Sequence, residues 1–307
     1  MSRRYTAVRG LARFTSVRAA VTAARHLAQR RVTAQYIADR ETNLPRTRLD
    51  GLDRAGVDTI VAGLRTDGLA QGLRLAPDTV AAVVDFAEHA LVYADREVDR
   101  GFRPHDRPAA EATLGKPILV AQYFNSQEEC PEIGAIATDP ALELIAARFL
   151  GSVPRLVGSS LWWTFPVDAT EADRNLHAHL FHRDVDDFAF LKFFFYLTPV
   201  AHGDGAHVCV LGSHDRPAAD GLGERLRLRR YSDDEIAARF APDRILEICG
   251  RAGEGFAENT LCVHKGLTPT RTPRLLLQFE FALFDHGVMH DRRPSESLRM
   301  LPIERPA

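Results

Sequence analysis

The stretch FHRDVDDFAFLKFFFYLTPVAHGDGAHVCVLGSH, residues 181–214, decides the fold class. It contains a long apolar run, Phe188–Val200, then a turn with Gly203 and Gly205, and then a short apolar run that starts at His207. Short runs rich in aromatic and β-branched residues, separated by turn residues, are typical of β-strands. The stretch therefore predicts consecutive strands of a β-structure.

The same succession of apolar runs and turns continues through the C-terminal half of the chain. Five runs are predicted to be strands: Arg155–Phe165, Phe188–Val200, His207–Leu211, Thr260–His264 and Leu275–Phe284. Between them, a helix is predicted over Ser232–Phe240, because Ser232 can act as its N-cap and Glu235 follows three residues later, as in a capping box. We expect the strands to form a sandwich or barrel.

The N-terminal half has helical patterns instead. Helices are predicted from about Val17 onward and over Asp53–Leu64, Pro77–Tyr93 and Asp139–Phe149. Pro77 suits a first helical position, and Gly151 marks the end of the last of these helices. Residues 99–112, rich in Arg, Pro and Asp, are expected to form a loop. The predicted fold is α+β, mainly β, with a helical N-terminal region packed on the β core.

The first segment is strongly basic. Eight arginines precede the first acidic residue, Asp39: Arg3, Arg4, Arg9, Arg13, Arg18, Arg25, Arg30 and Arg31. An Arg-rich, acid-poor start is compatible with an organelle transit peptide, with contact to anionic lipid or an anionic substrate, or with a helix packed on the body with solvated arginines. We expect residues 1–50 to be an extension and residues 51–307 to form one domain, with its β core at about residues 115–290.

Composition narrows the classes of function. The 307 residues are 45% hydrophobic and 26% charged, which is ordinary for a soluble globular protein. No run approaches the roughly 20 apolar residues of a transmembrane helix, and no secretory signal is expected. Because the net charge is -2, we expect no nucleic-acid partner.

The cysteines indicate the compartment. Cys130, Cys209, Cys249 and Cys262 are widely spaced and form no C-x-x-C pair, so neither a structural zinc site nor a disulfide framework is expected. We expect free, mostly buried thiols in a reducing compartment, which predicts a cytoplasmic location.

The sequence His182-Arg183-Asp184 is the strongest chemical signal. In an extended chain, residues i and i+2 project to the same side, so His182 and Asp184 can reach one ion. A third ligand would complete a two-histidine, one-carboxylate face, which leaves coordination positions open and is characteristic of non-haem Fe(II) oxygenases. His264 is the best third ligand, because it ends an apolar run and precedes a turn.

A candidate anion-binding residue follows His264. Arg274 stands ten residues later and opens the next apolar run. A returning strand would bring its guanidinium near the ligands, where it can grip a carboxylate as a bidentate fork. Arg271 is a second candidate for the same role.

These parts together resemble the phytanoyl-CoA dioxygenase family of Fe(II)/2-oxoglutarate oxygenases. The resemblance covers residues 155–284 and is carried by residues 181–214 and by the stretch CVHKGLTPTRTPRLLLQFEF, residues 262–281. It implies a double-stranded β-helix, that is, a cupin-like jelly roll, with Fe(II) held by the three candidate ligands. It also implies that 2-oxoglutarate binds the iron and the arginine, and that O2 is the second co-substrate.

The resemblance also implies the type of reaction. Halogenating relatives have a small residue where this chain has Asp184, so hydroxylation, or a related desaturation or cyclisation, is expected. The substrate is expected to be a small molecule oxidised in a biosynthetic or tailoring step. Two other hypotheses remain open: a cupin-like metalloprotein that does not use 2-oxoglutarate, and a jelly-roll binding module without catalysis.

Several other residues are candidates for the pocket. Lys192 stands inside an apolar run and needs a carboxylate partner, either 2-oxoglutarate or a structural Asp. Asp186 and Asp187 are expected to bind substrate hydroxyls or amines, or to cap the turn before Phe188. Four further candidates lie in the pocket or in ordinary structural positions: Gln122, Trp162, His177 and His179.

Overall fold

The protein is built on two antiparallel sheets, seen in a computed structural model that describes residues 3–214, 229–287 and 291–303. The large sheet has the order β1-β9-β6-β11-β5-β4-β2-β3, and the small sheet has the order β10-β7-β8. The strands are β1 Leu69–Arg74, β2 Val92–Ala94, β3 Gly101–Phe102, β4 Val120–Tyr123, β5 Arg155–Thr164, β6 Phe190–Tyr196, β7 His207–Val210, β8 Ile245–Ile248, β9 Glu254–Glu258, β10 His264–Gly266 and β11 Arg274–Ala282.

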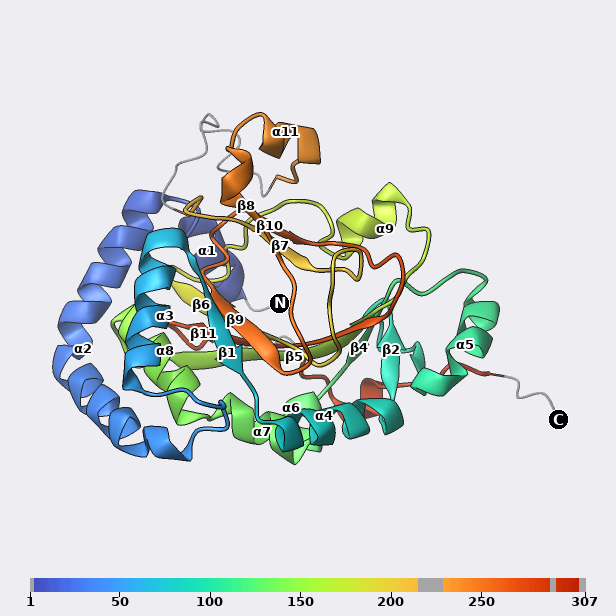
Figure 1. Ribbon diagram of the computed structural model, residues 1–307, viewed down its shortest axis with the longest axis horizontal. Helices are drawn as coiled ribbons and strands as arrows, with labels where there is room; N and C mark the ends of the chain where they lie inside the picture. Colours follow the sequence, from blue (N-terminus) through green and yellow to red (C-terminus); the bar gives the residue numbers. More distant parts are fainter. Residues whose placement is uncertain (1–2, 215–228, 288–290, 304–307) are drawn as a thin grey trace.

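Helices cover one face of the large sheet. The described helices are α1 Arg3–Leu11, α2 Thr15–Asn43, α3 Arg54–Asp67, α4 Pro77–His89, α5 Arg107–Leu114, α6 Ser126–Glu129, α7 Pro131–Ala137, α8 Pro140–Leu150, α9 Glu171–Leu176 and α11 Asp233–Ala237. Figure 1 shows α2, α3 and α8 along one side of the sheet, α4, α6 and α7 below it, and the small sheet above it. The expected combination of helices with a mainly β core is confirmed.

Alternation along β11 separates the core from the pocket. Leu275, Leu277 and Phe279 face the helices and belong to the main hydrophobic core. Successive side chains of a strand point to opposite faces, so Arg274 and Glu280 project from the other face, toward the small sheet, where they line a pocket. The sequence of one strand thus supplies both the core and the polar wall.

The predicted helix ends are confirmed where a capping residue defines them. Asp53 caps α3 by accepting from the backbone N–H of Gly56, and α8 ends at Gly151, which has a φ of 60°. Both hydrogen bonds of the capping box between Ser232 and Glu235 are present at α11.

Three local expectations were wrong. Helix α4 ends at His89 rather than Tyr93, because Val92–Ala94 pair with β4 as strand β2. The expected loop 99–112 contains β3 and the start of α5. The expected strand Thr260–His264 is instead a turn up to Val263, and His264 begins β10.

The N-terminal segment packs on the body as helices. The Nε of Arg9 in α1 donates to the carbonyl of Val185 at 3.1 Å, and α2 lies along α8, where Arg148 forms an ion pair with Glu41. Among the described helices, none has the length and apolarity needed to cross a membrane. All four cysteines are free thiols, and three of them are buried, as expected.

Candidate active site

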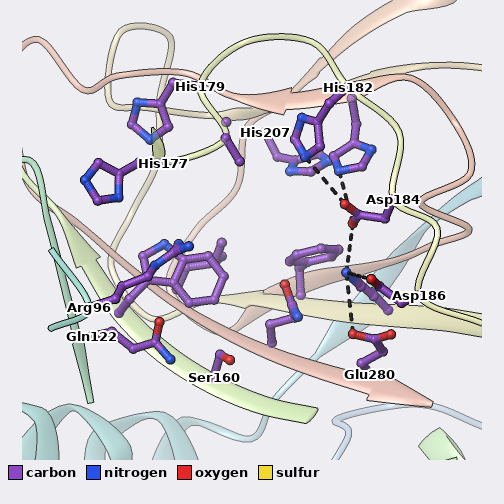
Figure 2. Close-up of a pocket in the computed structure, with 18 of the residues that line it drawn as sticks. Arg96, Gln122, Ser160, His177, His179, His182, Asp184, Asp186, His207 and Glu280 are labelled. Carbon is purple, nitrogen blue, oxygen red and sulfur yellow. Dashed lines mark hydrogen bonds and ion pairs between the residues drawn. The ribbon is translucent and has the colours of Figure 1, made fainter. Parts of the chain in front are cut away.

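A pocket of about 660 Å³ opens between the two sheets. Its floor consists of pocket-facing side chains of β4, β5, β6 and β11, and its upper wall comes from β7, β10 and the segment before β6. Helix α1 adds Tyr5 and Arg9 to the lining. Figure 2 shows polar and charged side chains converging on this space.

Three potential metal ligands meet in the pocket. One ligand atom each from His182, Asp184 and His264 lie within 4.8 Å of one another. The Nε2 atom of His182 is 3.6 Å from Asp184 Oδ1, and the Nε2 atom of His264 is 3.5 Å from Asp184 Oδ2. Two imidazoles and one carboxylate on one face are a donor set suited to Fe(II) with open coordination positions.

Backbone carbonyls fix the orientation of both imidazoles. The Nδ1 atom of His182 is 2.9 Å from the carbonyl oxygen of Leu180, and that of His264 is 2.9 Å from the carbonyl oxygen of Cys262. Because a carbonyl can only accept, both Nδ1 atoms carry the proton and both Nε2 atoms are directed at Asp184. Metal-ligating histidines are commonly oriented in this way, so the arrangement fits a metal ion.

The backbone holds the ligands in register. His182 and His264 exchange two backbone hydrogen bonds of 2.9 Å, and the backbone N–H of Asp184 donates to Thr260 at 2.9 Å. Arg183 points the other way and donates to the carbonyl oxygen of Ser213 at 2.8 Å. The alternation expected for His182-Arg183-Asp184 is therefore present, and the intervening arginine holds the turn Gly212-Ser213-His214, the Gly-Ser-His element.

Charges next to the ligands shift their protonation. Burial lowers the pKa of His182 well below its usual value, so this imidazole is neutral at pH 7. Burial also lowers the pKa of His264, but the negative charges of Glu258 and Asp184 outweigh it and raise this pKa to about 9. A metal ion that binds His264 must therefore displace a proton, which weakens metal binding in acid.

Lys192 is surrounded by carboxylates. Its Nζ is 2.8 Å from Asp184 Oδ2, 3.1 Å from Asp186 Oδ2 and 3.5 Å from Glu280 Oε2. Glu280 stands directly opposite Lys192 in the β6–β11 ladder. Of the two partners expected for Lys192, structural carboxylates are the ones present in the structure.

Arg274 has a guanidinium without a carboxylate partner in the described part of the chain. It is 3% exposed, it donates to the carbonyl oxygen of Gly205 and, at 3.1 Å, to Thr164 Oγ1, and its Nε has no partner there. Arg271, in contrast, lies at the surface and binds Asp204 through two nitrogens at 3.1 and 2.9 Å. Only Arg274 of the two lines the pocket.

The pocket is cationic near Arg274. Burial and the positive charges of Arg274 and Arg96 lower the pKa of His179 to about 2. His179 is therefore neutral, and its Nδ1 lies 2.8 Å from Thr268 Oγ1. His179 and His177 both line the pocket.

Of the remaining candidates, all but one lie in the pocket. Gln122, Trp162 and Asp186 line it, and the adjacent Trp163 packs on the opposite face of the sheet. Asp187 is fully buried away from the pocket, where it accepts from the backbone N–H groups of Phe188 at 2.7 Å and Phe284 at 2.9 Å. A substrate-binding role for Asp187 is therefore corrected to capping the turn before β6.

Sequence reasoning missed two residues beside His264. His207 Nε2 is 2.6 Å from Glu258 Oε2, and the His207 ring stacks on that of His264 with centroids 5.4 Å apart. Glu258 is fully buried and stands opposite Lys192 in the β6–β9 ladder. No local pattern in the sequence marks His207 or Glu258. Glu280 was also missed, although the need of Lys192 for an acidic partner was a signal for it.

A second set of potential ligands lies outside the pocket. His202, Glu247 and Cys249 offer atoms within 4.8 Å of one another, and His202 Nδ1 is 3.0 Å from Glu247 Oε2. The imidazole of His202 is 80% exposed.

No protein-family model and no curated protein sequence matches the chain. Among solved structures, it is similar to SnoN, a non-heme alpha ketoglutarate dependent epimerase from nogalamycin biosynthesis, at 18% identity, covering 75% of this chain and 83% of that chain with a TM-score of 0.49. It is also similar to HygX from Streptomyces hygroscopicus with nickel and 2-oxoglutarate bound, at 17% identity, 76% and 87% coverage and a TM-score of 0.47.

A third similar structure is EvdO2 from Micromonospora carbonacea var. aurantiaca complexed with 2-oxoglutarate, at 15% identity, 76% and 92% coverage and a TM-score of 0.49. At these identities and scores, similarity does not establish a shared activity. The chemistry of this chain is therefore inferred from its own residues.

Proposed function

We propose that this chain is a non-haem Fe(II) oxygenase that uses 2-oxoglutarate and O2 to oxidise a small molecule. The observation that carries the proposal is the combination, in one pocket, of the triad His182, Asp184 and His264 with the buried and uncompensated guanidinium of Arg274. A metal site without a dicarboxylate has no need for such a cation, because burying an unpaired charge is costly. The combination therefore favours 2-oxoglutarate over a cupin-like site that uses no keto acid.

Each residue has a distinct role in this proposal. The triad would hold Fe(II), and Arg274 would bind the distal carboxylate of 2-oxoglutarate as a bidentate fork. Bound Fe(II) with 2-oxoglutarate and O2 supplies the oxidising power for attack on a C–H bond. The hydrogen bonds of Thr164 and Gly205 to Arg274 aim the fork before the ligand arrives, which reduces the entropy lost on binding.

The finer assignments follow from the same residues. The large and small sheets, facing each other across the pocket, are assigned as the two halves of a double-stranded β-helix of the phytanoyl-CoA dioxygenase type. The carboxylate of Asp184 takes the position that a halide would need, which favours hydroxylation, or a related desaturation or cyclisation, in a tailoring step. Residues 51–307 are assigned as the oxygenase domain and residues 1–50 as an extension whose first helix contributes to the pocket wall.

The proposal is tested by turnover of 2-oxoglutarate. Purified protein is incubated with Fe(II), 2-oxoglutarate and O2, and succinate and CO2 are quantified, first alone and then with a panel of small molecules. We expect succinate formation that needs both Fe(II) and O2, that falls at least about a hundredfold in His264→Ala, and that is unchanged in His202→Ala.

The controls separate the alternatives. Loss of turnover in His202→Ala with retention of turnover in His264→Ala would indicate that the metal binds to His202, Glu247 and Cys249 instead. Folded, iron-loaded protein that converts no 2-oxoglutarate to succinate with any compound of the panel would favour a binding module instead.

A further inference from the structure

Arg96 is a pocket cation that the proposed function leaves unused. It stands in the turn between β2 and β3, lines the pocket, and is exposed to its interior. Figure 2 shows it on the side of the pocket opposite Asp184, close to His177 and Gln122. The inference below concerns the substrate class of this pocket and rests on the proposed function.

Arg96 differs from the other cations of the pocket in having no partner. Arg9 lies against Val185 and Asp186, Lys192 has three carboxylates, and Arg293 stacks on the ring of Phe124. Within the described ranges, the Arg96 side chain makes no hydrogen bond, ion pair or ring contact. A guanidinium stays charged at neutral pH, so Arg96 presents an uncompensated charge to whatever fills the pocket.

The turn that carries Arg96 is held in an unfavourable conformation. Asp95 and Arg96 have φ values of 55° and 64°, in the left-handed region, which is unfavourable for a non-glycine residue. The buried carboxylate of Asp95 fixes the turn through Arg100 at 2.6 Å and Lys116 at 2.8 Å. These ion pairs hold the turn, and with it Arg96, at the edge of the pocket.

One ring nitrogen of His177, beside Arg96, has no hydrogen-bond partner in the described part of the chain. His177 is buried, and its Nε2 lies 3.7 Å from Asp95 Oδ1. Its Nδ1 is buried and has no hydrogen-bond partner in the described part of the chain, although the residue lines the pocket. Burying a polar atom without a partner is unfavourable, and an anionic group held by Arg96 could accept a hydrogen bond from this nitrogen.

The ladder separates Arg96 from the site assigned to 2-oxoglutarate. Arg274 pairs with Thr164, which pairs with Val120, and the backbone N–H of Asp95 donates to Val120. Asp95 thus continues this row three strands from Arg274, roughly 14 Å away across the sheet, and Arg96 is the next residue along the chain. This separation allows two different anionic groups to be bound, one by each arginine.

We propose that Arg96, with His177 beside it, binds an anionic group of the substrate at the end of the pocket away from the metal. The chemistry is that of a carboxylate or a phosphate, both of which a guanidinium fork can grip. The substrate would therefore be an anionic small molecule, anchored by its charged group while a distant carbon lies near the triad.

Binding of matched probes tests this assignment. Phenyl phosphate, phenylacetate and neutral phenylacetamide are titrated into the anaerobic protein with Fe(II) and 2-oxoglutarate, and fluorescence of Trp162, which lines the pocket, reports binding. Trp162→Phe identifies the signal. We expect the anionic probes to bind at least about tenfold more tightly than phenylacetamide, as for a charge-assisted hydrogen bond, and their relative affinities identify phosphate or carboxylate.

Variants of Arg96 decide the outcome. Arg96→Gln should remove the preference for anions and leave the affinity for 2-oxoglutarate unchanged, and Arg96→Lys should keep part of the preference because the charge remains. Equal affinities for anionic and neutral probes, an unchanged preference in Arg96→Gln, or loss of 2-oxoglutarate binding in Arg96→Gln would each overturn the proposal. If 2-oxoglutarate does not bind the wild-type protein, the proposed function fails, whereas the same titration without 2-oxoglutarate still tests Arg96.

Discussion

Replacing Lys192 by Met should destabilise the metal-free protein strongly. The ammonium lies 2.8, 3.1 and 3.5 Å from three carboxylates, those of Asp184, Asp186 and Glu280, and it is almost fully buried. Removing one partner of a buried ion pair costs about 3–5 kcal/mol, because the remaining charges lose compensation. Protonated His264 beside Asp184 and Arg9 beside Asp186 supply part of it, so the lower end of this range is expected. With an unfolding entropy of about 2.1 cal/mol/K per residue over the whole chain, this range corresponds to a fall in Tm of roughly 5–8 °C.

A divalent metal ion should compensate for the missing ammonium. Its charge on Asp184 replaces that of Lys192, so addition of Co(II) should raise the Tm of Lys192→Met by more than it raises the Tm of the wild type. Thermal unfolding at pH 7.5, with EDTA and then with Co(II), measures both effects. Burial raises the pKa of Glu280 to about 8, so this carboxyl takes up a proton readily. A protonated Glu280 needs no cation beside it, so the fall in Tm of Lys192→Met should lie at the lower end of the range given above.

Lys265→Met is the matched control. Lys265 is also largely buried, but it pairs at 2.6 Å with one exposed carboxylate, that of Asp233. Water can hydrate the Asp233 carboxylate once the ammonium is gone, so Lys265→Met should lower the free energy of unfolding by no more than about 1 kcal/mol. Two results would contradict this role of Lys192. One is a Tm of metal-free Lys192→Met within 2 °C of that of the wild type, which corresponds to a difference of roughly 1 kcal/mol in the free energy of unfolding. The other is an equal rise in Tm of both proteins on addition of Co(II).

The remaining predictions concern pH dependence and packing. Burial raises the pKa of Asp291 to about 6, so this carboxyl should make the wild type lose stability as pH rises from 4 through 6, and Asp291→Asn should remove that loss. Denaturant unfolding should find Asp291→Asn more stable than the wild type by up to about 3 kcal/mol at pH 8 and equally stable at pH 4. Equal stability of the two proteins at pH 8 would contradict this. Gly255→Ala should destabilise by about 1–3 kcal/mol, because a Cβ there would meet the carbonyl oxygen of Phe194 at 2.5 Å. Gly10→Ala, with open space around it in α1, should stabilise by up to about 1 kcal/mol, and equal stability of the two variants would refute the packing account.

The sequence predicts those parts of the fold that local patterns determine. β6 and β11 are long runs rich in apolar and aromatic residues, and both form strands as expected. The i and i+2 spacing of His182 and Asp184 depends only on an extended backbone, which that segment has through its hydrogen bonds to residues 260–264.

Local patterns fail where tertiary packing decides. Residues 261–263 are apolar and were therefore predicted to be part of a strand. They form a turn next to the Gly-Ser-His element instead, and the backbone N–H of Val263 donates to Ser213 Oγ at 2.7 Å. Periodicity cannot separate a buried apolar turn from a short buried strand. Helix α5 could have been predicted, because Pro108 stands at its second residue, where a proline favours the start of a helix.

Pocket residues from distant segments leave no trace in the sequence. Tyr5 and Arg9 reach the pocket because α1 folds back over Val185 and Asp186. Arg96 belongs to a turn in the expected helical half, and only the pairing of β2 with β4 brings it to the pocket. These positions depend on the whole fold, so composition and spacing could not identify them.

The most direct test of the central claim is binding of 2-oxoglutarate to the iron form. Metal-stripped protein receives Fe(II) and 2-oxoglutarate without O2, and the weak visible charge-transfer absorption of a keto acid chelated to iron is recorded. We predict absorption in the wild type and in Arg271→Ala, none in His182→Ala, and at least about 30-fold weaker binding of 2-oxoglutarate in Arg274→Ala, from the loss of a buried charge pair. Folded, iron-loaded wild-type protein without this absorption, or Arg274→Ala with unchanged affinity, would contradict the account.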